Sequence, residues 1–147
     1  MTDERSLLEL SRADGWQLLA SVPVGRLVFT HQALPAVRLV NHLVDGDKIV
    51  IGLTPGSAIA TSAGTGGMVV AYEADALDLA ERLGWSVVVV GVARLVAGDE
   101  AVAQYLTRLR PWLSGATADI ITISSELVTG YRMVPSEPGR KIARAAS

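Results

Sequence analysis

Short segments in which apolar and polar residues alternate recur along this chain of 147 residues, with turn residues between them. Successive side chains of a strand point to opposite faces, so this period of two predicts β-strands. A helical pattern is confined to residues 11–20 and to connections. The predicted strands are Gly25–Thr30, Ala36–Leu43, Lys48–Leu53, Met68–Glu73, Trp85–Val96 and Asp119–Ile123, the last continued by Val128–Met133. Six strands without a βαβ rhythm predict a mainly β protein with peripheral helices, closed or partly closed into an antiparallel barrel.

The segment from Ala36 to Ala63 contains the clearest local signals. Its two strands are joined by Asp45-Gly46-Asp47, which is a tight-turn sequence because glycine accepts a positive φ. Thr54-Pro55 then predicts a helix start, with a hydroxyl at the N-cap and proline at the first helical position, and Gly64 predicts the helix end. The hydroxyls of Thr54 and Ser57 lie beside free N–H groups, which favours either a seat for an anion or an ordinary helix cap.

Outside the strands, the pattern predicts short helices and a polar tail. Ser6 and Glu9 have the spacing of a capping box, ahead of the predicted helix at residues 11–20. Residues 75–83 are acidic and mixed, which predicts a loop or one helical turn, and Asp99 predicts the cap of a further helix. Residues 1–136 are therefore expected to form a single domain, followed by a disordered tail at 137–147.

The strand Trp85–Val96 is apolar on both faces as far as Ala93. A small barrel has only one interior, so the second face of this strand needs another cover. Half of the residues in the chain are hydrophobic and the mean hydropathy is +0.36, yet no apolar run is long enough to span a bilayer. A second copy of the chain is the natural cover, so we expect a homodimer that buries this strand.

Charge and composition exclude several classes of function. The formal net charge is −2 and the basic residues are scattered, unlike the basic stripe of a nucleic-acid-binding protein. The absence of cysteine and the presence of only two histidines predict no metal site. The acidic N-terminus carries no visible signal peptide, so we expect a cytoplasmic protein without a membrane partner. The carboxylates fall mostly in turns and caps, no close pair is expected on a strand, and the catalytic residues stay unknown.

Two residues have candidate binding chemistry of their own. Arg38 lies within a predicted strand, where a guanidinium either forms an ion pair or binds an anionic ligand. Trp85 begins a strand, where an indole either belongs to the core or an interface, or stacks on a planar ligand. Neither residue by itself indicates which reaction the protein would catalyse.

Three segments, taken in order, resemble the pyridoxamine 5′-phosphate oxidase-like family of flavin-binding split barrels. They read VGRLVF at 24–29, LPAVRLVNH at 34–42 and GWSVVVVGVA at 84–93. Thr129-Gly130-Tyr131-Arg132 is similar to the usual end of the family, and the resemblance extends from about Ser11 to Val134. It implies a six-stranded antiparallel split β-barrel and a homodimer. It also implies that FMN lies in grooves at the dimer interface, with its phosphate near the third strand and the following helix.

The resemblance assigns the cofactor contacts residue by residue. Beside the flavin ring or ribityl chain it places Arg38, Val40 and Asn41. Toward the ring, from the same subunit or its partner, it places Trp85 and Ser86. Around the phosphate it places Ile51, Gly52, Leu53, Thr54, Ser57 and Ala58.

This chain departs from the family pattern at the cations. Where the family commonly has an Arg-Thr pair at the end of the third strand, this sequence has Gly52-Leu53, and Ala58 stands in place of a common lysine. Each lost charge-assisted contact is worth about 1.5–3 kcal/mol, which predicts weak or absent FMN binding. A deazaflavin, with its longer polar tail, is the alternative cofactor.

Two functions from different classes remain open. The first is a flavin-dependent oxidoreductase that uses FMN or a deazaflavin on a small-molecule substrate. The second is a non-catalytic split barrel that binds another small molecule and has lost FMN. The resemblance does not name the substrate or the electron acceptor.

Overall fold

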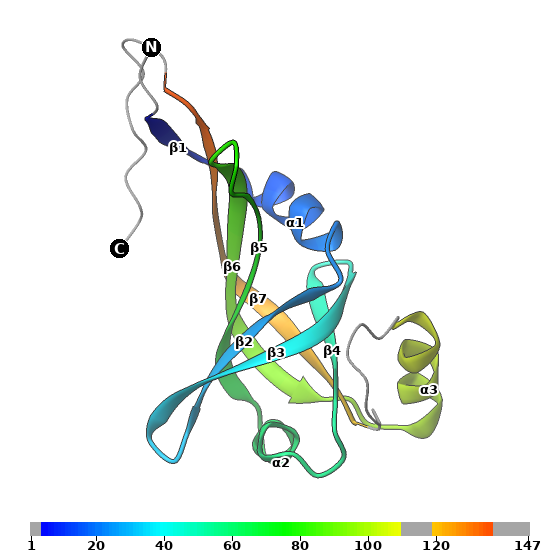
Figure 1. Ribbon diagram of the computed structural model, residues 1–147. Helices are drawn as coiled ribbons and strands as arrows, with labels where there is room; N and C mark the ends of the chain where they lie inside the picture. The colour runs from blue at the N-terminus through cyan, green and yellow to red at the C-terminus, as the bar shows by residue number, and fades with distance from the viewer. Residues whose placement is uncertain (1–3, 110–118, 137–147) are drawn as a thin grey trace.

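The computed structural model describes residues 4–109 and 119–136 of the chain. Its helices are α1 (Arg12–Ala20), α2 (Ala58–Gly64) and α3 (Asp99–Arg108). Its strands are β1 (Arg5–Glu9), β2 (Val24–His31), β3 (Leu34–Asp45), β4 (Lys48–Leu53), β5 (Met68–Asp78), β6 (Leu83–Leu95) and β7 (Asp119–Pro135). Figure 1 shows these strands wrapped around one interior, with the helices on the outside.

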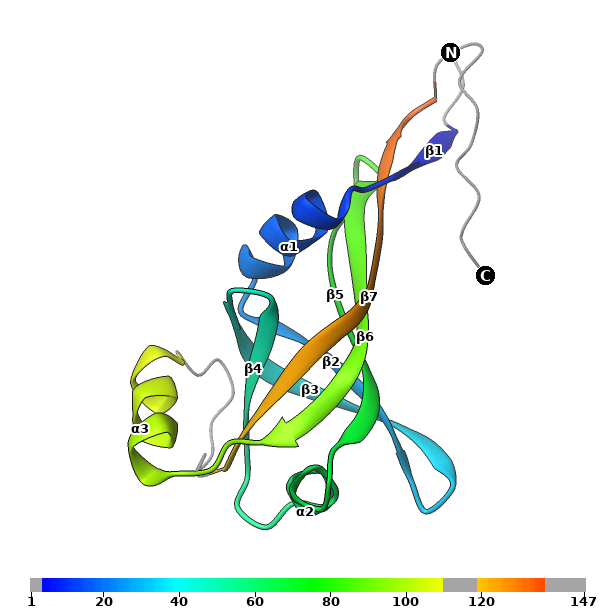
Figure 2. The same cartoon turned by 180° about the vertical axis from the view of Figure 1, so that it is seen from behind.

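Six of the strands form a closed antiparallel ring, which is seen from two sides in Figures 1 and 2. The order around the ring is β7-β4-β3-β2-β5-β6, and β6 returns to β7. β7 is continuous, and it pairs with β4 along its first half, with β1 at its end and with β6 along its other edge. The predicted mainly β fold, a six-stranded antiparallel split barrel with peripheral helices, is confirmed.

β1 is a strand that the sequence pattern did not predict. Ser6 and Glu9, which have the spacing of a capping box, both lie in it, and its residues pair with Tyr131–Pro135 of β7. A strand partner satisfies the backbone groups that a helix cap would otherwise serve, so the expected capping box was wrong. The real N-cap is Ser11, whose Oγ accepts a hydrogen bond of 3.1 Å from the Asp14 N–H, as expected for a helix at residues 11–20.

β5 and β6 form a hairpin that is longer than the sequence predicted. Residues 75–78 continue β5 and pair with β6 up to Asp78↔Leu83, so the loop or helical turn expected at 75–83 is wrong for most of that segment. Together with β1 and the end of β7, this hairpin extends beyond the ring (Figure 1). β2 pairs with β5 only from Arg26 to Val28, and the two strands separate beyond this short contact.

Two helices begin later or earlier than expected. The N-cap of α2 is Ser57 and not Thr54, because the Ser57 Oγ accepts from the Ala60 N–H at 3.2 Å. The N-cap of α3 is Gly98, and Asp99 is the first helical residue, where its charge suits the helix dipole. Among the residues that the structure describes, no helix is long and apolar enough to cross a membrane.

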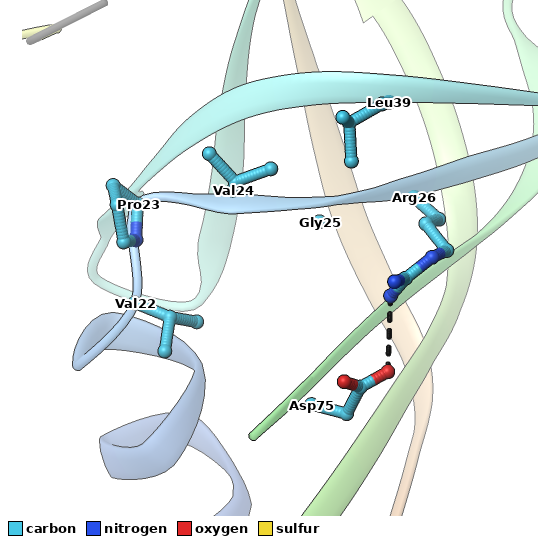
Figure 3. A pocket seen from close by; sticks show the side chains of 7 residues that line it. All are labelled: Val22, Pro23, Val24, Gly25, Arg26, Leu39 and Asp75. Atoms are coloured by element: carbon cyan, nitrogen blue, oxygen red, sulfur yellow. Dashed lines mark hydrogen bonds and ion pairs between the residues drawn. The ribbon is translucent and has the colours of Figure 1, made fainter. Parts of the chain in front are cut away.

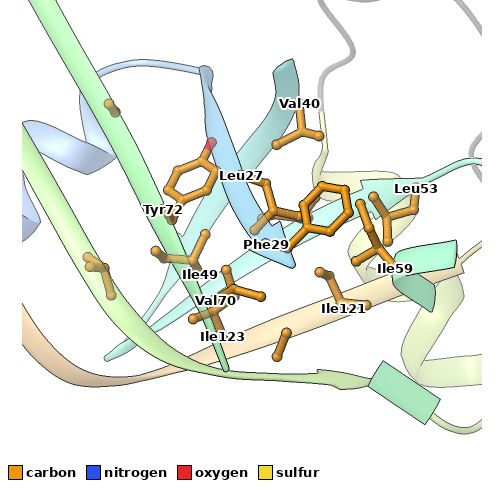
Figure 4. Close-up of a cluster of buried hydrophobic side chains, with 14 of the residues drawn as sticks. Leu27, Phe29, Val40, Ile49, Leu53, Ile59, Val70, Tyr72, Ile121 and Ile123 are labelled. Atoms are coloured by element: carbon orange, nitrogen blue, oxygen red, sulfur yellow. The ribbon is translucent and has the colours of Figure 1, made fainter. Parts of the chain in front are cut away.

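The barrel interior is filled by aliphatic side chains and a few aromatic ones (Figure 4). β6 contributes alternate residues to it: Trp85, Val87, Val89 and Ala93 are buried. Val88, Val90 and Val92 of the same strand face outward and are only half-buried. A single chain therefore buries one face of β6, and the expectation that both faces are buried stays a prediction about the assembled protein.

A buried polar network ties α1 to the barrel. His42 of β3 is 6% exposed, and its Nε2–H donates to the Leu19 carbonyl at 2.9 Å. The other ring nitrogen, Nδ1, then accepts from the Tyr72 hydroxyl. Burial lowers the pKa of His42 and raises the pKa of Tyr72, so both side chains are uncharged in the folded protein.

We expect this histidine to make the protein less stable in acid. In the unfolded chain its pKa is about 6.5, above the value in the folded chain, so its stabilising contribution is complete above that pH and is lost as the pH falls below it. The loss amounts to about 1.4 kcal/mol for each unit by which folding lowers the pKa. Denaturant unfolding at pH 7.5 and pH 5 should show that the stability advantage of the wild type over His42→Gln shrinks in acid. An advantage that is equal at both pH values would contradict the prediction.

Candidate functional site

One side of the barrel carries an exposed apolar surface, which we call the outer apolar face. It is formed by the outward side chains of β2, β3, β5 and β6, which the strand register brings side by side. Val37, Leu39 and Val69 are 63%, 49% and 70% exposed. On these four strands the face consists of Val28, Val37, Leu39, Val69, Ala71, Val88, Val90 and Val92. An apolar surface of this extent on a small chain marks a binding or assembly surface.

A pocket of about 290 Å³ lies at one edge of the outer apolar face (Figure 3). Leu39 belongs both to this pocket and to the outer apolar face. The remaining lining residues come from the α1–β2 connection, from β2 and from β5: Val22, Pro23, Val24, Gly25, Arg26 and Asp75. Most of its wall is apolar, and Figure 3 shows the Arg26 side chain directed toward the Asp75 carboxylate.

Arg26 is the centre of a charged cluster beside this pocket. Its Nη1 donates to Glu73 Oε1 at 2.9 Å and to Asp75 Oδ2 at 3.0 Å. Both carboxylates raise the pKa of Arg26. Burial, followed by the neighbouring Asp75, raises the pKa of Glu73 to about 7. One guanidinium nitrogen therefore serves two carboxylates, and Glu73 titrates close to neutral pH.

Sequence reasoning missed this cluster. The expectation that no close pair of carboxylates lies on a strand was wrong, because β5 continues past Glu73 and places Glu73 and Asp75 on one face. Their spacing of two residues was the available signal. It was masked by the prediction that the strand ended at Glu73. Within residues 4–109 and 119–136, no group of three His, Cys, Asp or Glu side chains is arranged to hold a metal ion.

The connection from β4 to α2 is where the resemblance places a flavin phosphate. The Gly56 N–H of this connection donates to Asp119 Oδ2 of β7 at 3.0 Å, and the Ser57 N–H donates to the Thr54 carbonyl at 3.3 Å. The sequence contains no Lys, Arg or His between Lys48 and Arg82. The β4–α2 connection therefore contacts the Asp119 carboxylate of β7, and residues 49–81 around it contain no basic side chain.

The structure separates the predicted cofactor contacts into buried and accessible residues. Val40, Ile51, Leu53 and Trp85 are 5%, 0%, 5% and 8% exposed and pack in the core. Arg38, Thr54 and Ala58 are exposed, while Asn41, Gly52, Ser57 and Ser86 are half-buried. Thr54, Ser57 and Ala58 lie together in the β4–α2 connection, whereas Arg38 and Asn41 lie on opposite faces of β3.

The surroundings of Trp85 and Gly52 affect whether these two residues can contact a flavin as predicted. In the single chain Trp85 is buried, so little of its indole surface is accessible to a ligand. Its stacking on a flavin stays a prediction. Gly52 pairs with Ile120 of β7, which is fully buried. Because paired residues of antiparallel strands share a face, a side chain at position 52 would point toward a covered side of the sheet. Its contact with a phosphate also stays a prediction.

Comparison with solved structures supports the fold. A FAD-binding protein from Mycobacterium smegmatis is 26% identical, with a TM-score of 0.65, over 86% of this chain and 98% of that one. A FAD-binding protein from Mesorhizobium loti has a TM-score of 0.71 at 18% identity, over 90% of this chain and 100% of that one, and at this identity it shows the fold alone.

Sequence comparison identifies the family of this chain. An uncharacterised protein of Mycobacterium tuberculosis is 47% identical over 133 residues, which cover 88% of each chain. Residues 11–141 match the family model described as pyridoxamine 5′-phosphate oxidase. This match covers most of the chain, including the ring of strands and the outer apolar face. The chain therefore belongs to the pyridoxamine 5′-phosphate oxidase-like family of flavin-binding split barrels.

Proposed function

We propose that this protein is a flavin-binding protein that works as a homodimer and takes FAD or a deazaflavin in preference to FMN. A bound flavin would supply oxidoreductase chemistry toward a small-molecule substrate. Membership of the family supports a flavin, and the similarity to the FAD-binding protein from Mycobacterium smegmatis supports the dinucleotide form.

The observation that carries the preference is the electrostatic character of the β4–α2 connection. The phosphate of FMN is dianionic and is the main charged group by which a protein can bind this cofactor. A phosphate site therefore needs cations or several free N–H donors. Here Asp119 already accepts the Gly56 N–H at 3.0 Å and adds a negative charge. Residues 49–81 contribute no cation. The residues of this connection do not fit an FMN phosphate.

A cofactor with a longer tail is less dependent on this connection. The adenosine half of FAD and the extended tail of a deazaflavin offer further groups that can bind elsewhere on the protein. Binding energy distributed over a larger ligand compensates for a weak single contact. FAD or a deazaflavin is therefore favoured over FMN.

The homodimer is supported by the outer apolar face. Val88, Val90 and Val92 of β6 are half-buried in the single chain, and Val69 beside them is 70% exposed. Water contact with such a surface is unfavourable by about 25 cal/mol for each Å² of apolar area. If a second copy of the chain packs its own outer apolar face against this one, both faces are removed from water in one isologous contact.

The test is the visible spectrum and the flavin content of the purified protein. Flavin released by acid is identified by mass spectrometry, and FMN, FAD and a deazaflavin are then titrated into the apoprotein. We expect FAD or the deazaflavin to bind at least about tenfold more tightly than FMN. A preparation that carries stoichiometric FMN would overturn the preference.

Removing the charge of Asp119 should improve FMN binding. Asp119→Asn keeps an oxygen that can accept from Gly56 but removes the negative charge near the incoming phosphate. We expect the FMN dissociation constant to fall about tenfold, since one repulsive charge near a protein surface is worth roughly 1–4 kcal/mol. Asp78→Asn is the matched control, because Asp78 also accepts backbone N–H groups, from Ala80 and Glu81, in the distant β5–β6 loop. If the two variants bind FMN equally, the phosphate does not approach Asp119.

A non-catalytic small-molecule-binding barrel is the second candidate. The observation in its favour is that Val40, Ile51, Leu53 and Trp85, four of the predicted flavin contacts, are packed in the core. A colourless preparation that binds none of the three flavins would support this candidate and overturn the flavin proposal.

A further inference from the structure

The pocket beside Arg26 has the features of a second binding site. It lies between the α1–β2 connection, β2, β3 and β5, away from the β4–α2 connection at the end of β4. Its volume of about 290 Å³ suits a small organic molecule. Val22, Pro23, Val24 and Leu39 form its apolar wall, and Arg26 and Asp75 form its polar side (Figure 3).

The charges on the polar side do not balance. Arg26 brings one positive charge, whereas Asp75 of the pocket lining and Glu73, which lies behind it on the same Arg26 Nη1, together bring two negative charges when both are ionised. The side chains of Glu73 and Asp75 are 27% and 24% exposed, so water solvates them only in part. A partly buried carboxylate without its own cation is unfavourable, and a second positive charge would relieve it.

We propose that this pocket binds an organic molecule with a single positive charge, whose cationic group sits on Asp75, next to Glu73, and whose apolar body packs against Val24 and Leu39. An alkylammonium or amidinium group donates the hydrogen bonds that the Asp75 carboxylate accepts. The short apolar wall selects a compact body such as one aromatic ring. This site uses neither Asp119 nor the β4–α2 connection, and it shares Leu39 with the outer apolar face, so it lies at the edge of the proposed dimer contact.

Binding of a cation is coupled to the protonation of Glu73. In the free protein its pKa is about 7, so below that pH a proton neutralises the second carboxylate. A bound cation takes the place of this proton, and binding therefore releases it. Glu73 therefore passes from mostly protonated to mostly ionised as the pH rises through neutrality, so the affinity should increase up to about tenfold between pH 6 and pH 8.

The surroundings contain few other groups that could produce this pH dependence. The residues paired with Glu73 and Asp75 are Arg26 on β2 and Val88 and Ser86 on β6, and among these described partners Arg26 alone is charged. Leu39 of β3 pairs with Arg26, and the α1–β2 connection presents Val22 and Pro23. Arg26 stays protonated at every pH considered because the carboxylates raise its pKa.

The experiment is calorimetric titration of the full-length protein with benzylammonium, phenethylammonium and benzamidinium at pH 6, 7 and 8. Benzyl alcohol and benzoate are the neutral and anionic ligand controls. We expect at least one cation to bind, about tenfold more tightly at pH 8 than at pH 6, while the two controls bind at least tenfold more weakly at pH 8. Repeating the titration in buffers with different ionisation enthalpies should show the release of close to one proton at pH 6.

Two variants and a matched control locate the site. Asp75→Asn and Glu73→Gln should each weaken the binding of the cation at pH 8 about tenfold or more and remove most of the pH dependence. Glu9→Gln removes an exposed carboxylate of β1 and should change neither. The proposal is overturned if all three cations fail to bind at about 10 mM, if benzyl alcohol binds as tightly as benzylammonium, or if the affinity is equal at pH 6 and pH 8. Unchanged binding in both variants would also overturn it.

Discussion

Replacing Gly91 with alanine is expected to destabilise the protein by about 3 kcal/mol or more. Gly91 is buried in β6, at the bulge where the register with β7 shifts between Val90 and Gly91. A Cβ atom at this position would overlap the carbonyl oxygen of Ser124, and its third neighbour would be Ile123 Cγ2 at 3.2 Å. A backbone carbonyl cannot move aside as a flexible side chain can, so the strands would have to separate locally.

The effect is large because β6 and β7 close the ring. β7 also pairs with β4, which means that a shift near Ser124 disturbs two neighbours at once. Denaturant unfolding followed by circular dichroism measures the loss. Gly64→Ala is the control, since its nearest neighbour is the flexible side chain of Leu95 at 3.3 Å, and it should stay within about 1 kcal/mol of the wild type. A Gly91→Ala variant with the denaturation midpoint of the wild type would show that the β6–β7 contact is looser than described.

Replacing Val90 with glutamate is expected to convert the proposed homodimer into a monomer. Val90 lies on the outer apolar face, between Ala71 of β5 and Leu127 of β7 in the strand register. In a symmetric dimer each copy would bring one unpaired carboxylate into an apolar contact, which costs about 3 kcal/mol or more. The dimer dissociation constant should therefore rise at least about a hundredfold.

Light scattering and sedimentation at several protein concentrations measure this change. Leu79→Glu is the control, because Leu79 is 85% exposed in the β5–β6 loop and is not part of the outer apolar face. It should leave the dimer intact. Circular dichroism of Val90→Glu should show a folded barrel, since the residue is only half-buried in the single chain. A wild-type protein that is monomeric at micromolar concentration would contradict the assembly.

Local signals in the sequence determined much of the fold. The bounds of β4 at Lys48–Leu53, the Gly46 turn before it and a helix at residues 11–20 were read from residues that are neighbours in the chain. These features depend on interactions over a few residues, so a short window contains their cause. The antiparallel ring followed from the rhythm of strands and turns, and the family followed from three short segments.

The tertiary structure alone decided which distant residues meet. β1 exists because Arg5–Glu9 finds a partner at the far end of the chain, in β7, which overrides its capping-box spacing. The cluster at Arg26 depends on the short pairing of β2 with β5, and the hydrogen bond between Gly56 and Asp119 joins residues 63 positions apart. Such contacts form only when the ring closes, because closure and not local preference sets which strands become neighbours. The charges beside the pocket and the carboxylate at the β4–α2 connection, on which both proposals rest, are consequences of that closure.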